Sequence, residues 1–471
     1  MKIVLVHYHL KPGGVTTVVL HQARALIEAG DEVLIISGEE PRVPLPVEPG
    51  APDQTALTVK VVPELHYDQW RPAPGRDIAG ALLEAVKSVW NGADVFVVHN
   101  PLIRKNSALL GALKKLGRTE RLLLQNHDLA EDFRPDVYAN EEYPENCHYA
   151  VINSRDYSFL LQSGLKREGL HLIPNEVRSI AADPGVERRR YLYPVRGIRR
   201  KNLGEALLLS LFIPEGRTVA VTQPPTTERD TGIYLRWKEL AGELGLPVEF
   251  EAGTKTGFSR LLGSAAAAVT TSVKEGFGFS FLEPWTAGLA VAGRRIGYVC
   301  ADFEEAGLRF DAFYDSIGLP KCETTRDYPE QFRTRLEQAV NALYAAFGRE
   351  TPGAIEAAIQ NFASLLPDFG AMDEPMQEDF IRRAAADGGL RSALAEINPF
   401  LKEFSEWTPD PSLVEANREV VLSYYSRERI TKILRESCRA ATVPVVQSIS
   451  RSRLLELFLD PSRISLVGIA R

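Results

Sequence analysis

The sequence predicts an α/β fold built from two doubly wound, Rossmann-like parallel sheets in series. Three observations predict it. Short apolar runs alternate with amphipathic stretches up to about residue 175, the same alternation starts again near residue 190, and the strand signal disappears beyond about residue 325. The length of 471 residues suits two or three domains.

The first elements form a βαβ unit. A buried strand from Ile3 to Val6 precedes a Gly13-Gly14 turn, an amphipathic helix from Val15 to Ala29 and a second strand from Glu32 to Ser37. This order implies a parallel sheet. Because the turn lacks the Gly-x-Gly-x-x-Gly spacing, the sequence disfavours a nicotinamide-dependent dehydrogenase.

The alternation continues after a long loop expected over residues 39–58. Further strands are expected at Val59 to Val62, Asp94 to Val98, Arg121 to Gln125 and Tyr149 to Asn153. Helices are expected between them at Ile78 to Trp90 and Ser107 to Leu116. Three strands end in polar groups, namely His99-Asn100-Pro101, Asn126-His127-Asp128 and Asn153-Ser154. Open α/β sheets bind ligands at this edge, although each histidine taken alone is better explained as a loop residue with a local hydrogen bond.

A second lobe begins after a boundary expected near residues 175–190. Its expected elements are strands at Tyr191 to Val195, Thr218 to Thr222, Val248 to Ala252, Ala265 to Val269 and Leu289 to Ala292, with helices at Leu203 to Leu211 and Ser259 to Leu262. We therefore expect an N-terminal lobe over residues 1–180 and a second lobe over 181–325, with a ligand cleft between them.

The remainder reads as helical. Residues 326–439 are expected to belong to the second lobe, with a break at Trp407 to Pro411 and one long helix from Glu415 to Cys438 that carries a capping signal at Ser426. Residues 440–471 are expected to rejoin the first lobe through the apolar cluster Leu454 to Leu459. Weak membrane or partner binding by that cluster is the alternative.

Composition narrows the class of protein. Cys147, Cys300, Cys322 and Cys438 lie far apart without Cys-x-x-Cys spacing, which argues against a disulfide framework or a structural zinc site and fits a reducing compartment. The net charge of −7 argues against a general nucleic-acid binder. No stretch approaches the apolar length of a membrane span, so a cytoplasmic protein is expected.

One stretch carries most of the chemistry. From Thr271 to Gly293 the chain ends a buried strand, turns at Gly276 and Gly278 and enters a helix, with Glu275 and Glu283 on either side of the turn. Free backbone N–H groups at the helix start and glycines that permit close approach suit a phosphorylated or polyhydroxylated ligand. The Glu-x7-Glu spacing alone is a weak signal.

A basic turn follows the first strand of the second lobe. In Arg196-Gly-Ile-Arg-Arg-Lys201, Arg196 and Lys201 lie five positions apart around a glycine, so both cations can converge on one diphosphate beside the helix that starts at Leu203. A solvated basic loop is an equally good explanation of this turn by itself.

Taken in order, these features resemble the retaining GT-B glycosyltransferases of the family 4 type. The resemblance covers roughly residues 1–300 and rests on the Gly13-Gly14 turn, His127-Asp128, Asn175-Glu176-Val177, Arg196-x4-Lys201 and Glu275-x7-Glu283. It implies a transfer of a hexose, glucose or mannose, from a UDP- or GDP-linked sugar to a sugar, glycoside or small hydroxylated metabolite. It implies no metal and no cofactor.

The resemblance also implies roles for residues. Arg196, Lys201, Gly13 and Gly14 would face the donor diphosphate, Glu283 would hold the ribose hydroxyls, and the backbone of Gly276, Phe277 and Gly278 would lie against sugar and phosphate. Glu275, His127 and Asp128 are the implied catalytic residues. Glu275 and His127 would contact the transferred sugar, and Asp128 would orient the acceptor or the histidine. No glutamate would act as a nucleophile, because the leaving phosphate would deprotonate the acceptor on the same face.

The chain departs from the family pattern, and other functions stay open. Pro194 interrupts the first strand of the second lobe, so Arg199 or Arg200 could share the role of Arg196, and Glu176 replaces a usual glycine. The alternatives are a glycosidase that uses the glutamate pair, which would have no use for the basic turn, an epimerase or phosphorylase of the same fold, and a non-catalytic sugar-nucleotide-binding protein.

Overall fold

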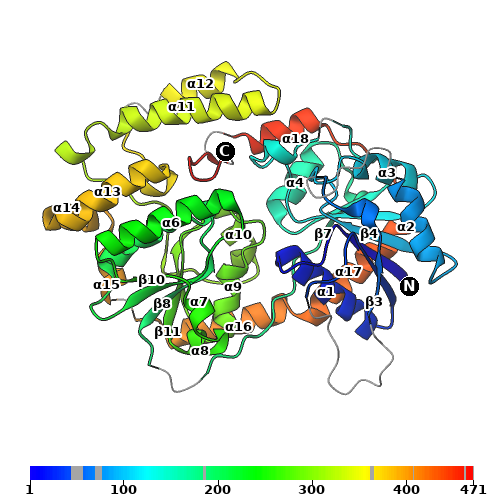
Figure 1. The fold of residues 1–471 in the computed structure, drawn as a ribbon, viewed down its shortest axis with the longest axis horizontal. Coiled ribbons are helices and arrows are strands. Elements are labelled where there is room, and N and C mark those ends of the chain that lie inside the picture. Colours follow the sequence, from blue (N-terminus) through cyan, green and yellow to red (C-terminus); the bar gives the residue numbers. More distant parts are fainter. Residues whose placement is uncertain are drawn as a thin grey trace. The chain divides into compact units, whose positions relative to one another are not determined.

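The computed structural model describes residues 1–43, 57–68, 77–139, 141–183, 187–360, 365–406, 408–460 and 463–469. The chain forms two compact units (Figure 1): unit 1 is Met1–Glu176 with Tyr425–Leu459, and unit 2 is Val177–Tyr424 with Asp460–Arg471. The chain therefore passes from one unit to the other three times. Most of the expected loop at 39–58 lies outside the described residues.

Unit 1 contains a seven-stranded sheet in the order β3-β2-β1-β4-β5-β6-β7, in which every neighbouring pair is parallel. The strands are β1 Lys2–His7, β2 Glu32–Ser37, β3 Thr58–Val61, β4 Val95–His99, β5 Leu122–Asn126, β6 His148–Val151 and β7 Leu170–Leu172. The order reverses direction between β1 and β4, so their carboxyl ends form the switch point where open sheets of this class bind ligands.

Helices cover both faces of this sheet (Figure 1). They are α1 Gly14–Glu28, α2 Ile78–Lys87, α3 Leu109–Leu116, α4 Ser154–Gln162, α17 Arg427–Ala441 and α18 Arg451–Phe458, with 3-10 turns η1 Pro63–Leu65, η2 Pro135–Val137 and η3 Arg167–Gly169. Alternate residues of β1 enter opposite cores, with Val4 and Val6 in one and Ile3 and Leu5 in the other. A strand buried on both faces reads as an unbroken apolar run, which is why its sequence predicted it.

Unit 2 contains a six-stranded parallel sheet in the order β10-β9-β8-β11-β12-β13. The strands are β8 Arg190–Arg196, β9 Thr218–Gln223, β10 Val248–Glu249, β11 Ala265–Thr270, β12 Val291–Arg294 and β13 Phe313–Tyr314. The pairing of β8 with β9 shifts register between Tyr193 and Arg196. Pro194 lies in this irregular part, because a proline has no N–H to donate within a central strand.

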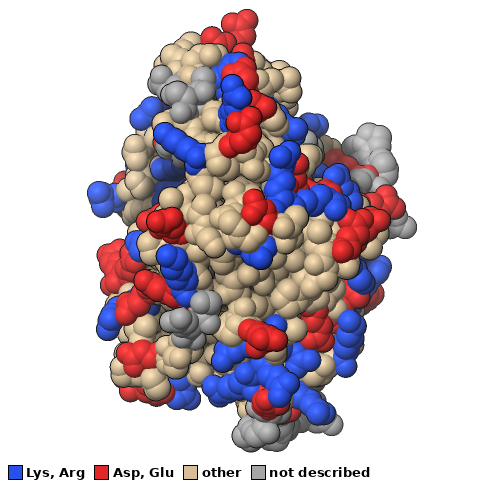
Figure 2. Space-filling view, turned by 90° about the vertical axis from the view of Figure 1, so that its left-hand side faces the viewer, with Lys and Arg blue, Asp and Glu red and all other residues tan. Residues whose placement is uncertain are grey.

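The helices of unit 2 include a long helical region after β13. They are α5 Leu203–Leu209, α6 Glu228–Glu243, α7 Ala252–Lys255, α8 Phe258–Gly263, α9 Phe279–Thr286, α10 Gly297–Glu305, α11 Tyr328–Ala346, α12 Gly353–Gln360, α13 Glu374–Ala386, α14 Gly388–Ile397, α15 Pro399–Glu406 and α16 Pro411–Tyr424, with η4 Arg199–Lys201, η5 Ser210–Phe212, η6 Glu323–Thr325 and η8 Phe369–Ala371. Acidic and basic side chains are interspersed on the face shown in Figure 2, as suits a net charge of −7.

The C-terminal region differs from the sequence expectation. The single helix expected from Glu415 to Cys438 is two helices, α16 and α17, and the Ser426 side chain accepts the backbone N–H of Arg429 to cap the second. The apolar period continues across the break, which hid it from the sequence pattern. The chain also re-enters unit 1 at Tyr425 rather than near 440, and its last residues belong to unit 2 rather than to unit 1.

Candidate functional site

The carboxyl edge of the unit 2 sheet brings together the two turns that the sequence singled out. The turn after β8 contains η4 and leads into α5, and the turn after β11 leads into α9. Gly278 caps α9 in the left-handed region, at a φ of 96°, and a Cβ on it would lie 2.9 Å from Val299 Cγ1. Only glycine meets both conditions, so this turn is shaped by its sequence.

Lys201 and Glu275 form a buried ion pair at this edge. Lys201 Nζ donates to Glu275 Oε1, and the two side chains are 11% and 6% exposed. Arg200 Nη1 donates to Glu275 Oε2 at 3.1 Å and to the Lys274 carbonyl at 2.9 Å. Two cations therefore share one carboxylate, which leaves the cluster with a net positive charge.

Burial and charge shift the protonation of this cluster. Burial, with a smaller contribution from the Arg200 charge, lowers the pKa of Lys201 to about 8 in spite of the nearby Glu275 carboxylate. Burial also opposes ionisation of Glu275, but the charges of Lys201 and Arg200 outweigh it and hold the pKa of that carboxyl below its usual range. The Lys201–Glu275 pair is therefore charged at neutral pH.

Buried side chains hold the backbone of the basic turn in place through hydrogen bonds. Thr271 Oγ1 donates to the carbonyls of Lys201 and Asn202 at 3.0 and 2.9 Å, and the Tyr193 hydroxyl also donates to the Lys201 carbonyl. Asn202 has a left-handed backbone, with φ 57°, and its side-chain oxygen accepts a hydrogen bond from Gln377. The turn is thus preorganised by buried polar contacts rather than by its own sequence.

Glu283 lies on α9 in a different environment from Glu275. Its carboxylate has no hydrogen bond or ion pair within the part of the chain that the structure describes, and burial raises its pKa to about 7. The two glutamates of the Glu-x7-Glu spacing are therefore not equivalent. One is a paired, ionised carboxylate, and the other is poised to change charge near neutral pH.

Arg196 lies at the end of β8 and makes no ion pair among the described residues, whereas Arg200 and Lys201 both pair with Glu275. The Phe277 ring is buried and packs edge-on against Phe279, with ring centroids 5.0 Å apart. The Phe277 side chain therefore contributes to the packing of unit 2.

Arg199 has a structural task that the sequence did not reveal. Its guanidinium binds both oxygens of Glu374 on α13 and the carbonyls of Leu466 and Ile469 in the C-terminal tail. No local signal predicts this, because the partners lie far away in sequence.

In unit 1, three histidines meet at the carboxyl edge of the sheet. His7 ends β1, His99 ends β4 and His127 follows β5. His99 Nδ1 lies 3.0 Å from His127 Nε2, and the two rings are stacked. The Asn100 side-chain oxygen accepts the backbone N–H of His127 at 2.6 Å, which fixes the start of the following loop. The sequence singled out His127 but gave His7 and His99 no role.

All three imidazoles are neutral at physiological pH. Burial lowers the pKa of His7 to about 3 and that of His127 to about 4, and it holds the pKa of His99 well below its ordinary value. His7 Nδ1 and His99 Nε2 are buried without a hydrogen-bond partner in the described part of the chain. These two nitrogens are therefore available for hydrogen bonds to water or to a ligand at this edge.

Asp128, Gly13 and Gly14 lie closer to solvent. Asp128 pairs with Arg134 at 3.5 Å, and its backbone N–H donates to Asn100. The two glycines are exposed at the start of α1, and no described atom would obstruct a Cβ on either within 3.5 Å. Packing inside the protein therefore does not explain the glycine pair.

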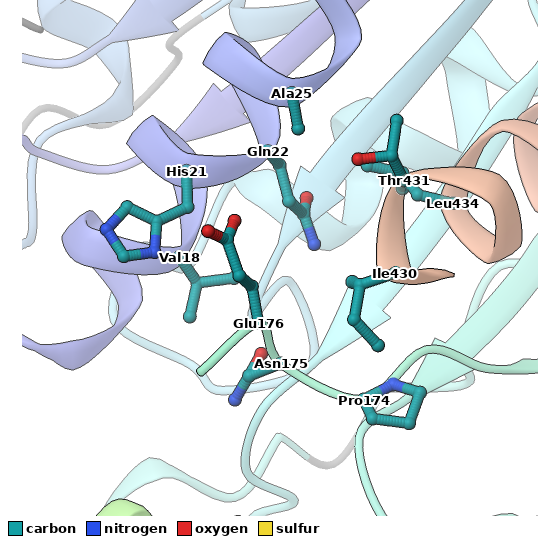
Figure 3. Close-up of a pocket in the computed structure, with 10 residues that line it drawn as sticks. All are labelled: Val18, His21, Gln22, Ala25, Pro174, Asn175, Glu176, Ile430, Thr431 and Leu434. Atoms are coloured by element: carbon teal, nitrogen blue, oxygen red, sulfur yellow. The ribbon is translucent and has the colours of Figure 1, made fainter. Parts of the chain in front are cut away.

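A separate pocket lies between α1, the segment 174–176 and α17 (Figure 3). The Gln22 amide points into it, and its oxygen and nitrogen, like the Asn175 side-chain oxygen, lack a partner among the described residues. Next to it, Arg427 binds Glu28 at 2.8 Å and Glu176 at 3.1 Å. Buried polar atoms that face a cavity commonly bind ordered water in proteins.

The described residues contain no group of three or more His, Cys, Asp and Glu side chains placed to hold a metal ion. Nor does the described part of the chain contain a helix long and apolar enough to cross a membrane. The four cysteines are unpaired.

Comparison with solved structures decides the fold. Sucrose-phosphate synthase of Thermosynechococcus elongatus superposes with a TM-score of 0.53 at 15% identity, over 93% of this chain and 98% of that one. The Anabaena protein HepE in complex with UDP superposes with a TM-score of 0.53 at 14% identity, over 93% of this chain and 99% of that one. For a glycosyltransferase of Rickettsia africae the TM-score is 0.52 at 13% identity, over 93% of this chain and 98% of that one. The chain has the GT-B fold. The predicted fold class is thus confirmed.

Sequence comparison supplies one curated relative. The mannosylglucosyl-3-phosphoglycerate synthase of Petrotoga mobilis is 26% identical over 326 residues, which is 59% of this chain and 61% of that protein. The match thus spans about three fifths of the relative's length. No protein-family model matches the chain.

Proposed function

We propose that this GT-B protein is a glycosyltransferase that moves a hexose from a UDP- or GDP-linked sugar to a hydroxylated acceptor, with retention of configuration and without a metal. The observation that carries the proposal is the buried cluster of Lys201, Arg200 and Glu275 at the carboxyl edge of the unit 2 sheet. The fold shared with the Anabaena protein that binds UDP supports it.

The chemistry of the cluster suits a nucleotide diphosphate. Cleavage of a sugar–phosphate bond builds negative charge on the leaving diphosphate, and cations fixed in advance stabilise that charge. In the proposal Lys201 and Arg200 exchange part of their contact with Glu275 for phosphate oxygens, and Arg196 adds a third charge. Glu275 then accepts hydrogen bonds from hydroxyls of the transferred sugar, and Glu283 accepts them from the ribose.

In the proposal, unit 1 contacts the transferred sugar and the acceptor. His127 is neutral and can exchange hydrogen bonds with a hydroxyl of the transferred sugar at its free ring nitrogen, while Asp128 orients the acceptor. The name of the Petrotoga relative describes a product that contains a phosphoglycerate and two sugars. We therefore favour an acceptor that is itself a glycoside with a phosphate or carboxylate, within the wider class of small hydroxylated metabolites.

The test is a transfer assay with UDP-glucose and GDP-mannose against neutral and phosphorylated glycosides. We expect nucleoside diphosphate release that depends on acceptor, a product with the donor's anomeric configuration by NMR, and the same rate in EDTA. Glu275→Gln should abolish transfer while UDP or GDP binding persists. Binding without transfer or hydrolysis under any acceptor would support a non-catalytic sugar-nucleotide-binding protein instead.

A further inference from the structure

The C-terminal tail, residues 463–469, packs on unit 2 next to the basic turn. The backbone N–H of Leu466 donates to the Ala371 carbonyl at 2.8 Å, and those of Gly468 and Ile469 return to the Ser465 carbonyl, so the tail forms a closed turn. Val467 is buried and lines a pocket together with Gly197, Leu203 and Trp237. The tail is therefore an integral part of unit 2.

Arg199 joins this tail to the basic turn. Its side chain is only 9% exposed, and its guanidinium binds Glu374 through two nitrogens, the Ile469 carbonyl at 2.5 Å and the Leu466 carbonyl at 2.6 Å. A buried guanidinium with this many charge-assisted contacts has a fixed direction. Since Arg199, Arg200 and Lys201 form one short helical turn, η4, the fixed residue sets where the other two project.

The tail also approaches the second turn of the candidate site. A Cβ built on Gly468 lies 3.7 Å from Val273 Cγ2, and the Val273 backbone N–H donates to the Arg200 carbonyl at 3.0 Å. The turn after β8 and the turn after β11 are thus linked to each other and share the tail as a neighbour. Both turns carry charged members of the cluster, namely Arg200, Lys201 and Glu275.

We propose that Arg199 and the C-terminal tail are positioning elements of the donor site, because together they hold the turn that aims Arg200 and Lys201 at a diphosphate. If the tail carbonyls are removed, buried N–H groups of Arg199 lose their acceptors, and the turn rearranges to give them new ones. The side chains of Arg200 and Lys201 must then be ordered when the ligand binds, which weakens binding. The identity of the ligand rests on the proposed function, whereas the effect on the turn does not.

The experiment compares Arg199→Ala, a chain that ends after Asp460, and both changes together with the full chain. Arg236→Ala is the matched control, because Arg236 on α6 also binds a glutamate of α13, Glu378, at 3.0 Å but is 59% exposed. The readouts are UDP affinity by calorimetry and backbone hydrogen exchange over residues 196–203 in unliganded protein.

We expect each single change to weaken UDP binding roughly tenfold and to speed exchange in the turn, with KM for the donor rising more than kcat falls. The combined change should add little, because both remove the same contact. Arg236→Ala should leave both readouts unchanged.

Unchanged UDP affinity and unchanged exchange in Arg199→Ala would overturn the proposal. If the truncated chain fails to fold by circular dichroism, Arg199→Ala decides alone. If the full chain does not bind UDP or GDP at all, the proposed function fails, and hydrogen exchange still decides whether the tail holds the turn.

Discussion

The carboxyl edges of the two sheets handle buried polar groups in opposite ways. In unit 2, Lys201, Arg200 and Glu275 are ionised and paired with one another. In unit 1, His7, His99 and His127 are kept neutral by burial, and two of their ring nitrogens have no partner in the described part of the chain. The edge in unit 2 therefore presents charged groups, and the edge in unit 1 presents neutral hydrogen-bonding groups.

This difference suits two kinds of ligand. A preorganised positive cluster favours a dianion and gains most from developing negative charge, whereas neutral imidazoles with open nitrogens favour hydroxyl groups. Under the proposed function, unit 2 would therefore recognise the phosphates, and unit 1 would add hydrogen bonds to sugar hydroxyls. Substitutions in each unit test this division of roles.

After the loss of transfer expected for Glu275→Gln, the largest effect is expected for Lys201→Ala. It removes a fixed cation and leaves the Glu275 carboxylate buried with only Arg200, so transfer should fall about 100-fold and UDP binding about tenfold. Initial-rate kinetics and calorimetry check this. Arg196→Ala and Arg200→Ala, measured alongside, decide which arginine shares the role of Lys201, and wild-type activity in Lys201→Ala would refute the assignment.

The second prediction concerns the way Glu283 makes the unfolding free energy depend on pH. Its pKa is raised in the folded protein from 4.5 to about 7, so the stability that its protonated form contributes is complete below pH 4.5 and is lost as the pH rises to about 7. Relative to Glu283→Gln, the wild-type protein should lose about 3 kcal/mol of unfolding free energy between pH 4.5 and 8. Urea unfolding at these two pH values measures it.

The same group gives a ligand prediction. If the ribose donates hydrogen bonds to the Glu283 carboxylate, UDP affinity should rise more steeply with pH through about 7 in the wild-type protein than in Glu283→Gln. An equal pH dependence in both proteins would place the ribose elsewhere.

A smaller effect is expected for His127→Ala in unit 1. Loss of one neutral hydrogen bond to the sugar should lower kcat/KM about tenfold and leave UDP affinity unchanged. His171→Ala is the control, because His171 forms a second stacked histidine pair with His148 in the same unit. A change in UDP affinity would contradict the division of tasks between the units.

The smallest effect is expected for Arg427→Ala. Arg427 resembles Arg199 in binding carboxylates across the fold, but its side chain is 31% exposed, so its pairs with Glu28 and Glu176 are screened. The unfolding free energy should fall by about 1 kcal/mol and the difference should shrink in high salt. Arg418→Ala, which removes only an exposed pair with Glu415, should have no measurable effect.

Local patterns predicted the elements that position the candidate site. The strands from Glu32 to Ser37 and from Ala265 to Val269 were visible as apolar runs because parallel strands are buried on both faces. A capping signal was visible at Ser426, but the apolar period runs through it, so the sequence predicted one helix where the structure has two. The apolar period indicates which face of a helix is buried, but it does not indicate which unit the helix packs against.

By itself, the sequence determined the two parallel sheets, the glycine turn at Gly278 and the placing of His127, Lys201 and Glu275 at strand ends, because these depend on neighbours along the chain. Only the tertiary structure decided that Lys201 shares Glu275 with Arg200, that Arg199 belongs to the tail and that His127 stacks on His99. Ion pairs and ring contacts join residues distant in sequence, so their partners are fixed by the fold and not by spacing.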